Sequence, residues 1–397
     1  SDSDGTISGY QWYSSIDGLI STSGNFTIST LSLGNHTISF KVKDNDGAWS
    51  ANKTSWVDVR MGPLWSDTTT HNINAVAISA DGEYLVAGEH DGYVYFYEIS
   101  NSTPKWSSEV GSRVYAVAIS ADGSYIAVGS DDNKVYLFGK NSSTSLWSYN
   151  TESDVRTIAI SADGNYIAAG GQANKVYLFG KSSSTPIWSY SVGNQIDSIS
   201  ISADGEYIVA GSQNAKINLF DKDSSTPLWT YTAGDFVRDV SISADGEYIV
   251  SCSGDEKVRL FHRTSSTPLW TYTADGGFAN PSRSCDISAD GEYIAVGNME
   301  DDNRVYLFDK DSSTPLWYYS ASDNIYTVSI SKDGQYIIAG SSDDKIYFFG
   351  KDNNTPLWTY TAGGDLNSVS ISADGEYAIA GSSDDKVYTF KNYLANR

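Results

Sequence analysis

Eight polar positions recur along this chain at a nearly constant spacing, and they are the first candidates for a binding site. Each stands five residues before the serine of a Ser-Ala-Asp-Gly sequence, which reads Ser-Lys-Asp-Gly in one copy. Their side chains vary widely, whereas the positions just after them vary little. If these side chains gather around one opening, they would bind a polar ligand. The alternative is that solvent-facing positions vary freely in sequence without a function. They are Asn74, Tyr115, Arg156, Asp197, Arg238, Arg283, Tyr326 and Asn367.

A second group of candidates lies where the repeated pattern breaks, in its fifth and sixth copies. One copy exchanges Ala-Gly-Ser for Ser-Cys-Ser and gains basic residues, and two connections are longer than their counterparts. These departures indicate either a binding site on one face of the two copies or neutral drift, and drift is favoured because loops tolerate insertion. The residues are Ser251, Cys252, Ser253, Arg259, His262 and Arg263, with the loop 274–283 and the turn 298–303.

The two cysteines, Cys252 and Cys285, stand in consecutive copies of the pattern. Cys252 takes the place of a small residue and Cys285 that of a core valine. If consecutive copies pack face to face, the two could form a disulfide, provided that their Cα atoms lie within about 7 Å. Buried free thiols are the alternative, because cysteine often serves as a small core hydrophobe.

Calcium is the only cofactor for which the sequence offers candidates, and they are weak. Calcium sites need several oxygen ligands around one ion. The acidic turns lack the alternating spacing that supplies them, so we interpret these turns as solvated: Asp131-Asp132, Asp255-Glu256, Asp301-Asp302, Asp343-Asp344 and Asp384-Asp385. The denser candidates are Asp2, Asp4, Asp44 and Asp46.

Catalytic machinery is not indicated, and we predict no catalytic residue. The four histidines, His36, His71, His90 and His262, have no metal-ligand spacing. The sequence has neither a Gly-x-Ser-x-Gly elbow nor a Cys-His arrangement that suggests a nucleophile.

These candidates are embedded in eight copies of one unit, which must fold before any of them can be positioned. The copies are marked by an Asp-Gly pair that recurs every 41 residues except for steps of 45 and 43, and by a tryptophan with the same period. A period near 40 residues indicates a solenoid, propeller or array. The aspartates are Asp81, Asp122, Asp163, Asp204, Asp245, Asp290, Asp333 and Asp374; the tryptophans are Trp65, Trp106, Trp147, Trp188, Trp229, Trp270, Trp317 and Trp358.

Each unit contains four short runs rich in Val, Ile, Tyr, Phe and Trp, separated by polar turn sequences. The glycine of Ala-Asp-Gly stands where a short hairpin needs a positive φ. Four strands per unit without helical periodicity predict an all-β, eight-bladed propeller at 61–397. The array begins with a lone fourth strand, Leu64–Ser66, and ends with three strands at Leu366–Phe390. We therefore expect the first strand to complete the last blade and close the ring.

The motifs resemble known propeller families. The stretch from Val305 to Trp317 is similar to the repeat of quinoprotein-type eight-bladed propellers, in which the tryptophan docks neighbouring blades. The Ile-Ser-Ala-Asp-Gly-Glu-Tyr-Ile half resembles the WD40 and YVTN repeats of archaeal surface-layer proteins. The resemblance covers roughly residues 63–391 and implies the architecture. It does not imply quinoprotein activity, because the cofactor of those dehydrogenases sits against two adjacent cysteines with calcium ligands, and here no cysteines are adjacent.

Residues 1–60 carry no copy of the repeat and predict a small β-sandwich with four alternating runs. Its Asp4-Gly5-Thr6-Ile7 and Asp44-Asn45-Asp46-Gly47 sequences resemble the PKD family of Ig-like domains, which implies a spacer on a secreted or surface protein. In that family the first strands precede the Asp-Gly-Thr-Ile motif, so the sandwich is expected to be incomplete. Upstream chain or a strand from another subunit would complete it. The expected strands are Ile7–Tyr13, Asn25–Thr30, Thr37–Val42 and Ser55–Val59.

Charge and composition narrow the expected partners. The chain has 49 acidic and 26 basic residues and a net charge of −23, so we expect no nucleic-acid partner, because phosphate binding needs a basic face. No apolar run is long enough to span a membrane. Surface glycans are expected at some of six Asn-x-Ser/Thr sites, which are Asn25, Asn35, Asn52, Asn101, Asn141 and Asn353.

Together these features predict a non-enzymatic extracellular or cell-surface protein. The propeller would be a scaffold for protein or glycan contacts and residues 1–60 a spacer, with self-assembly into a surface layer or filament through the incomplete sandwich. The alternative is a quinoprotein-like dehydrogenase or another propeller enzyme with its site at the channel mouth.

Overall fold

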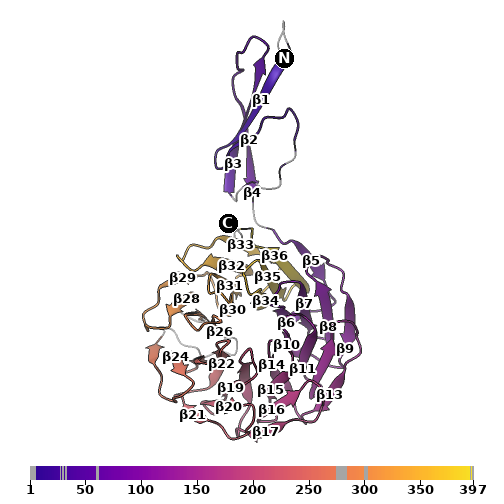
Figure 1. Cartoon of the computed structure of the whole chain (residues 1–397), viewed down its shortest axis with the longest axis vertical. Helices are drawn as coiled ribbons and strands as arrows, with labels where there is room; N and C mark the ends of the chain where they lie inside the picture. The colour runs from indigo at the N-terminus through magenta and orange to yellow at the C-terminus, as the bar shows by residue number, and fades with distance from the viewer. Residues whose placement is uncertain are drawn as a thin grey trace. The chain divides into compact units, whose positions relative to one another are not determined.

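A computed structural model describes residues 6–26, 28, 31, 34–59, 62–273, 284–298, 303–393 and 395 of the chain. Within these residues all regular structure is β: nine four-stranded antiparallel sheets and no helix. The chain divides into two compact units, Ser1–Gly62 and Pro63–Arg397. The second unit is a propeller of eight blades around a central channel (Figure 1).

Every blade is a meander of four strands, ordered from the channel outward as the sequence predicts, with the innermost strand first in the chain for each copy. Blade 1 comprises β6 (Ile73–Ile78), β7 (Tyr84–Glu89), β8 (Tyr93–Glu98) and β9 (Trp106–Glu109); blade 2 comprises β10 (Val114–Ile119), β11 (Tyr125–Ser130), β12 (Lys134–Gly139) and β13 (Trp147–Asn150); blade 3 comprises β14 (Val155–Ile160), β15 (Tyr166–Gly171), β16 (Lys175–Gly180) and β17 (Trp188–Ser191); blade 4 comprises β18 (Ile196–Ile201), β19 (Tyr207–Ser212), β20 (Lys216–Asp221) and β21 (Trp229–Thr232). Blade 5 comprises β22 (Val237–Ile242), β23 (Tyr248–Ser253), β24 (Lys257–His262) and β25 (Trp270–Thr273); blade 6 comprises β26 (Ser284–Ile287), β27 (Tyr293–Gly297), β28 (Arg304–Asp309) and β29 (Trp317–Ser320); blade 7 comprises β30 (Ile325–Ile330), β31 (Tyr336–Ser341), β32 (Lys345–Gly350) and β33 (Trp358–Thr361); blade 8 comprises β34 (Leu366–Ile371), β35 (Tyr377–Ser382), β36 (Lys386–Lys391) and β5 (Trp65–Thr68).

The Ser-Ala-Asp-Gly turn is held by its own side chains. In blade 4 the Ser202 hydroxyl donates to Asp204 Oδ1 at 2.6 Å and accepts from the Tyr207 backbone N–H at 3.0 Å. Gly205 has φ +76°, which confirms the predicted positive φ. A Cβ on Gly205 would lie 2.5 Å from the ring of Tyr166 in blade 3. The turn therefore requires glycine for its backbone and for the approach of the neighbouring blade.

The repeated tryptophans join consecutive blades, as the resemblance implies. The indole of Trp188 donates to the Lys222 carbonyl of the next blade at 2.7 Å and packs 5.3 Å from the ring of Phe220. Six further tryptophans make the same donation, but the indole nitrogen of Trp358 is buried without a hydrogen-bond partner in the described structure. Seven of the eight blade junctions are thus held by an indole that both donates a hydrogen bond and packs against an aromatic ring.

Strand β5 closes the ring, which confirms the expected pairing of the two incomplete ends. It pairs antiparallel with β36 as the outermost strand of blade 8, with Trp65 opposite Thr389 and Thr68 opposite Lys386. The strand begins at Trp65, one residue later than predicted. Trp65 also donates to the Ile99 carbonyl of blade 1, so the closing strand contacts both sides of the junction.

A closed circle of eight backbone hydrogen bonds surrounds one end of the channel. In each turn, the N–H of the residue after the serine donates to the carbonyl of its counterpart in the next blade, at 2.9–3.1 Å. The last of these bonds runs from Ala373 back to Ala80. The members are Ala80, Ala121, Ala162, Ala203, Ala244, Ala289, Lys332 and Ala373.

The first unit differs from the predicted sandwich. Its described residues form one sheet in the order β2-β1-β3-β4, built from β1 (Ile7–Ser14), β2 (Gly18–Ser21), β3 (Gly34–Asp44) and β4 (Lys53–Val59). Residues 25, 26 and 28 of the run predicted as a strand lie in no strand, and the rest of that run lies outside the described residues. Strand β2 was not predicted, because its sequence Gly-Leu-Ile-Ser is too short for alternation to be visible.

Candidate functional site

The eight polar candidates mark a bulge at the start of the innermost strands. In seven blades the pairing of the first two strands skips one residue, and that residue is the candidate. A bulge leaves one residue unpaired and redirects its side chain. Arg283, the candidate in blade 6, lies outside the described residues. The other seven are half-buried at corresponding ends of their strands, as expected of a channel mouth.

Cationic and aromatic side chains of blades 2 and 3 interact at this mouth. The guanidinium of Arg156 lies 3.8 Å from the centre of the Tyr115 ring, and that of Arg113 lies 5.4 Å from it. Arg156 also forms an ion pair with Asp154 at 2.8 Å. Such stacking holds guanidinium groups in place while leaving N–H donors available.

An ion pair links blades 4 and 5 at the same mouth. Arg238 contacts Asp197 at 3.2 Å, with both side chains mostly buried. Asp197 Oδ1 also accepts from the amides of Gln195 at 2.8 Å and Gln213 at 3.0 Å. The structure therefore brings together Tyr115 with Arg156 and Asp197 with Arg238, in four consecutive blades.

The asparagine candidates have a different role. Asn74 donates to the Val114 carbonyl at 3.1 Å, and Asn367 donates to the Ile73 carbonyl at 2.9 Å. Each amide thus joins its blade to the next, so these two positions are structural contacts. Tyr326 is half-buried in blade 7.

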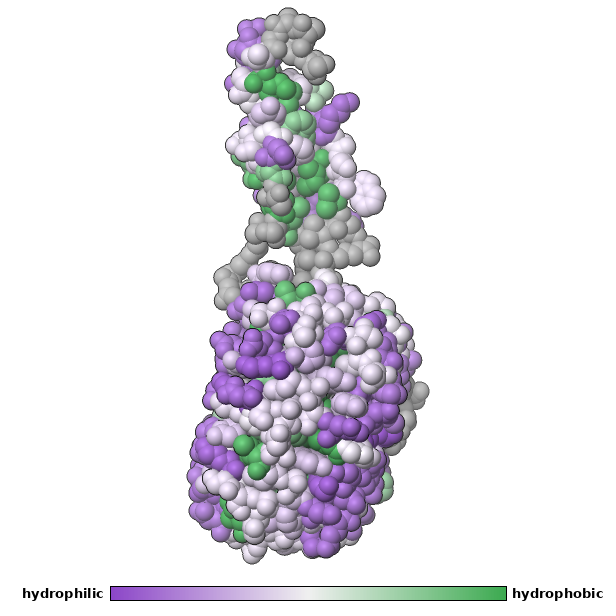
Figure 2. All heavy atoms as spheres, turned by 90° about the vertical axis from the view of Figure 1, so that its right-hand side faces the viewer, coloured by the Kyte–Doolittle hydropathy of each residue, from purple (hydrophilic) through white to green (hydrophobic). Residues whose placement is uncertain are grey.

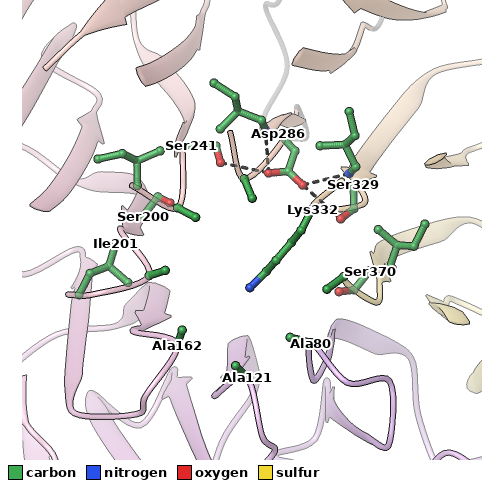
Figure 3. Close-up of a pocket in the computed structure, with 18 of the residues that line it drawn as sticks. Ala80, Ala121, Ala162, Ser200, Ile201, Ser241, Asp286, Ser329, Lys332 and Ser370 are labelled. Carbon is green, nitrogen blue, oxygen red and sulfur yellow. Dashed lines mark hydrogen bonds between the residues drawn. The ribbon is translucent and has the colours of Figure 1, made fainter. Parts of the chain in front are cut away.

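The opposite end of the channel is a separate cavity of about 290 Å³ (Figure 3). Its wall is built from eight isoleucines together with alanine and serine side chains, and the residues of the hydrogen-bonded circle form its rim. Seven of the rim residues are alanines, and the eighth, Lys332, projects its ammonium group into the opening. Ser200, Ser241, Ser329 and Ser370 line the cavity on blades 4, 5, 7 and 8.

A half-buried carboxylate in blade 6 joins three blades beside this cavity. Asp286 accepts from the Ser241 hydroxyl at 3.0 Å and the Ser329 hydroxyl at 3.2 Å, and from the backbone N–H groups of Ile287 and Ile330 at 2.9 and 3.1 Å. Burial raises the pKa of this carboxyl, while the four hydrogen bonds oppose the rise. Four donors fill the usual acceptor capacity of a carboxylate.

A second half-buried carboxylate, Asp239, lies on β22. It accepts from the Ser198 hydroxyl at 2.6 Å, from the Cys285 N–H at 2.8 Å and from the Val240 N–H at 2.9 Å. Burial raises the pKa of Asp239 to about 7, with these hydrogen bonds acting against the rise. Asp239 therefore connects blade 5 to blades 4 and 6 by hydrogen bonds.

Sequence reasoning missed Asp239, Asp286 and Lys332. The signal was present, because other copies carry only Ala, Ser or Thr at the two aspartate positions and Ala at the lysine position. Aligning the eight innermost strands position by position would have found them.

Comparison with protein families matches the chain to the PQQ-like repeat family described as outer membrane protein assembly factor BamB, over residues 49–272, 175–320 and 254–392. The chain belongs to this family. A search of curated proteins found no match.

A quinone cofactor of the kind bound by quinoprotein dehydrogenases does not fit the described channel. The residues that line the cavity include no cysteine, and Cys252 and Cys285 are buried in the core between blades 5 and 6. Asp286, the carboxylate in the lining, already accepts four hydrogen bonds. We therefore derive no redox step through such a group.

The raised pKa of Asp239 predicts a dependence of stability on pH. Its ordinary value is 3.8 and its folded value about 7, so between these values the folded state binds more protons than the unfolded state. Stability contributed by this group is complete below the unfolded pKa and is lost as pH rises through the folded pKa. We expect the free energy of unfolding to fall by about 1 kcal/mol between pH 5 and pH 6 on account of this group.

The variant Asp239→Asn tests this origin. Urea unfolding at pH 5 and pH 6 should show a smaller decrease in the variant than in the wild-type protein. Some decrease should remain, because burial raises the pKa of Asp286 as well. An equal decrease in both proteins would contradict the assignment to Asp239.

The candidates in blades 5 and 6 are only partly described. Arg259 is buried and donates to the Ser253 hydroxyl at 2.7 Å and to Asp255 Oδ1 at 3.0 Å. This ion pair gives Arg259 a structural role. His262 contacts Thr264, and Arg263 packs over the ring of Tyr207. Residues 274–283 and 299–302 lie outside the described structure, so a binding site on these connections stays a hypothesis.

The acidic turns have specific partners within their own hairpins. In blade 7, Asp343 accepts from the Tyr347 hydroxyl at 2.5 Å and forms an ion pair with Lys345 at 3.3 Å. Equivalent contacts occur at Asp132 and Asp384, and Asp255 is paired with Arg259. Asp44 caps a turn through the Ala48 N–H. Asp2, Asp4 and the pair Asp301-Asp302 lie outside the described residues, within which no group of three or more His, Cys, Asp or Glu side chains is placed to hold a metal ion.

The remaining predictions concern the surface. All six Asn-x-Ser/Thr asparagines are exposed, so glycosylation at Asn25, Asn35, Asn52, Asn101, Asn141 and Asn353 is sterically open and stays a prediction. The described part of the chain contains no helix long and apolar enough to cross a membrane.

Proposed function

We propose that this chain is a non-enzymatic structural or binding subunit of an extracellular or cell-surface assembly. The propeller is the scaffold for contacts with proteins or glycans, and the first unit joins the chain to another copy. The observation that carries this proposal is the apolar face of the first sheet, which the described residues cover only in part.

No hydrophobic side chain of the first unit is fully buried among its described residues; only Ser14 and His36 are. One face of the sheet nevertheless carries a cluster of aromatic rings. Trp12 lies opposite Phe40 in the pairing of β1 with β3, with their ring centres 4.1 Å apart, and Phe26 packs 5.5 Å from Trp12. Figure 2 shows hydrophobic residues gathered on this unit, whereas hydrophilic residues cover much of the visible side of the propeller.

A hollow of about 370 Å³ opens on this face. Its apolar lining includes Trp12, Phe26, Ile38 and Val57, and Val57 on the edge strand β4 is 41% exposed. In a complete sandwich a second sheet would fill such a hollow. Here the described residues supply a single sheet, so the face is suited to receive apolar side chains from another molecule.

The edges of the sheet suit the same partner. Strand β4 pairs only with β3 and strand β2 only with β1, so each has a free edge within the described structure. Unpaired N–H and C=O groups along an edge strand can pair with a strand from another chain. A second copy could thus supply both hydrogen bonds and apolar side chains.

The propeller and the surface chemistry support the rest of the proposal. The family description names an assembly factor. A closed ring of eight similar blades is a rigid platform on which loops can vary. Six exposed glycan-acceptor sequences and a net charge of −23 are compatible with a secreted, soluble surface.

The test is self-association of the full chain. Val57→Lys places a charge at the hollow, whereas Thr54→Lys places the same charge on the same strand but on the opposite face, since residues three apart along a strand point to opposite faces. Light scattering and negative-stain imaging should show concentration-dependent oligomers for the wild-type protein and for Thr54→Lys. Val57→Lys should weaken association by about tenfold or more, since burying a valine contributes roughly 1.5 kcal/mol.

A wild-type chain that stays monomeric at all concentrations would contradict the assembly proposal, as would equal association of the two lysine variants. The enzyme alternative has its own assay. Reduction of an artificial electron acceptor by the purified protein with an alcohol or sugar substrate would favour a propeller dehydrogenase over a scaffold.

A further inference from the structure

Cys252 stands where the other seven blades have glycine on their second strand. A Cβ on any of those glycines would lie 2.3–2.8 Å from the side chain of the first residue of the next blade's innermost strand, which is closer than packing allows. These glycines are Gly88, Gly129, Gly170, Gly211, Gly297, Gly340 and Gly381.

Blade 5 departs from this rule together with its neighbour. In blade 6 the counterpart of that first residue is Ser282, where the other seven blades have Val, Ile or Leu, and Ser282 lies outside the described residues. Cys252 is fully buried, in one core cluster with Cys285. Cys252 thus adds a side chain at a position where the other seven blades have none. The facing strand of blade 6 differs as well, because it carries Cys285 in place of a core valine.

The repeat itself supplies the geometry between these two positions. Cys285 takes the place of a core valine, and in five other blades the Cγ1 of that valine lies 3.1–3.2 Å from a Cβ placed on the facing glycine. The sulfur of cysteine occupies the place of a valine Cγ. In a disulfide the Cβ of one cysteine lies about 3 Å from the sulfur of the other, as follows from its bond lengths. The two positions are therefore spaced for a disulfide without movement of either blade.

Both thiols are free and buried in this structure. Burial raises the pKa of the Cys285 thiol well above its ordinary value, and the hydrogen bond with Cys252 adds to the rise. A thiolate is needed for disulfide exchange. Once the blades have packed, the pair is therefore slow to be oxidised to the disulfide or reduced to the thiols.

We propose that Cys252 and Cys285 are an oxidation site, closed to a disulfide while the protein folds in an oxidising compartment. The oxidant is a small or protein disulfide. The thiolate of one cysteine attacks that disulfide, forms a mixed disulfide and releases one thiol. The thiolate of the second cysteine then attacks the sulfur of the first and releases the second thiol. Two electrons pass to the oxidant, and its two leaving thiolates take up the two protons.

The disulfide would link blades 5 and 6, the two copies in which the repeated pattern is interrupted. It joins the second strand of blade 5 to the innermost strand of blade 6 and encloses the long connection 274–283. This proposal rests on the proposed function for the oxidising compartment, whereas the ability of the two core residues to form the bond does not depend on it.

Thiol counting tests the proposal on the full chain. The protein is refolded with a mixture of reduced and oxidised glutathione or with a strong reductant, then denatured and alkylated without further reduction. Intact mass should show no alkylated thiol after oxidative refolding and two after reducing refolding. A proteolytic digest of the first sample should contain one peptide pair that joins Cys252 to Cys285.

Two variants serve as matched controls because each restores the residue of the other blades. Cys252→Gly and Cys285→Val should each leave one thiol that is alkylated under both conditions. The double variant should show the same urea midpoint with and without reductant, whereas the wild-type midpoint should be higher when oxidised. Two alkylated thiols in wild-type protein that has refolded with oxidant to its native circular dichroism would overturn the proposal.

Discussion

A chain that begins at Thr69 should unfold at a markedly lower temperature than one that begins at Met61, because only the longer chain keeps β5. The shorter chain loses the outermost strand of blade 8 and exposes the edge of β36. It also loses Trp65, which packs 5.3 Å from Tyr97 and donates to Ile99 of blade 1. Truncating a large core aromatic costs about 3–5 kcal/mol, and we expect a loss of at least this order.

The comparison isolates the closing strand because both truncated chains lack the first unit. Thermal unfolding should be followed by circular dichroism, with the full chain as reference. Amide exchange provides a local readout, since the N–H groups of β36 should lose protection first in the shorter chain. Equal midpoints for the two truncated chains would show that closure by β5 does not stabilise the ring.

Replacing Gly205 with alanine is expected to destabilise the propeller by about 2–4 kcal/mol. The residue has φ +76°, and a left-handed conformation costs an L-residue about 1–2 kcal/mol. In addition, the new Cβ would lie 2.5 Å from the ring of Tyr166. Overpacking of this kind typically costs about 1–3 kcal/mol. Urea unfolding would measure the change.

The matched control is Gly180→Ala, a glycine of blade 3 at the end of β16. Its nearest contact for an added Cβ is Ile187 at 3.7 Å, which is ordinary packing. The change in unfolding free energy should stay within about 0.5 kcal/mol. If Gly205→Ala lowers the free energy of unfolding by no more than Gly180→Ala does, the neighbouring blade must be able to move and accommodate the new Cβ at the turn.

The propeller was predictable because each local signal is repeated eight times. The period gave the number of blades, the Ala-Asp-Gly turn gave the hairpins, and the lone strand at Trp65 gave the closure. Chance patterns do not recur in phase, so repetition replaces the averaging over homologues that a single sequence lacks. Errors were confined to strand ends, where side-chain pattern is a weak guide.

The first unit was less predictable because its signals occur once. The alternating runs correctly indicated β1, β3 and β4, but the expected second sheet did not appear among the described residues. The run at 25–28 is apolar for a different reason, since Phe26 packs against Trp12 from a connection and not from a strand. Hydrophobicity alone cannot distinguish these two ways of covering a sheet.

For the candidate site, sequence reasoning found the variable mouth and missed the channel. The bulge residues stand out because they are large and polar. Asp239 directly follows the bulge residue of its strand and Asp286 is the third residue after its counterpart in blade 6. Serine and threonine are common at these two positions, so a carboxylate there looks like one more polar substitution. Its burial and its contacts with neighbouring blades depend on the curvature of the ring, which no single repeat encodes.

The pairing of β5 with β36 determines how the propeller responds to mechanical tension between its two ends. The strands are antiparallel, and Trp65, where the chain enters β5, lies opposite Thr389 near the end of β36. The incoming and outgoing segments therefore leave the same end of one strand pair. Pulling them apart loads the hydrogen bonds one after another, as in the opening of a zipper, and not all together in shear. The other seven blades carry little of the load, so under tension the ring opens at its seam while its remaining sheets stay folded.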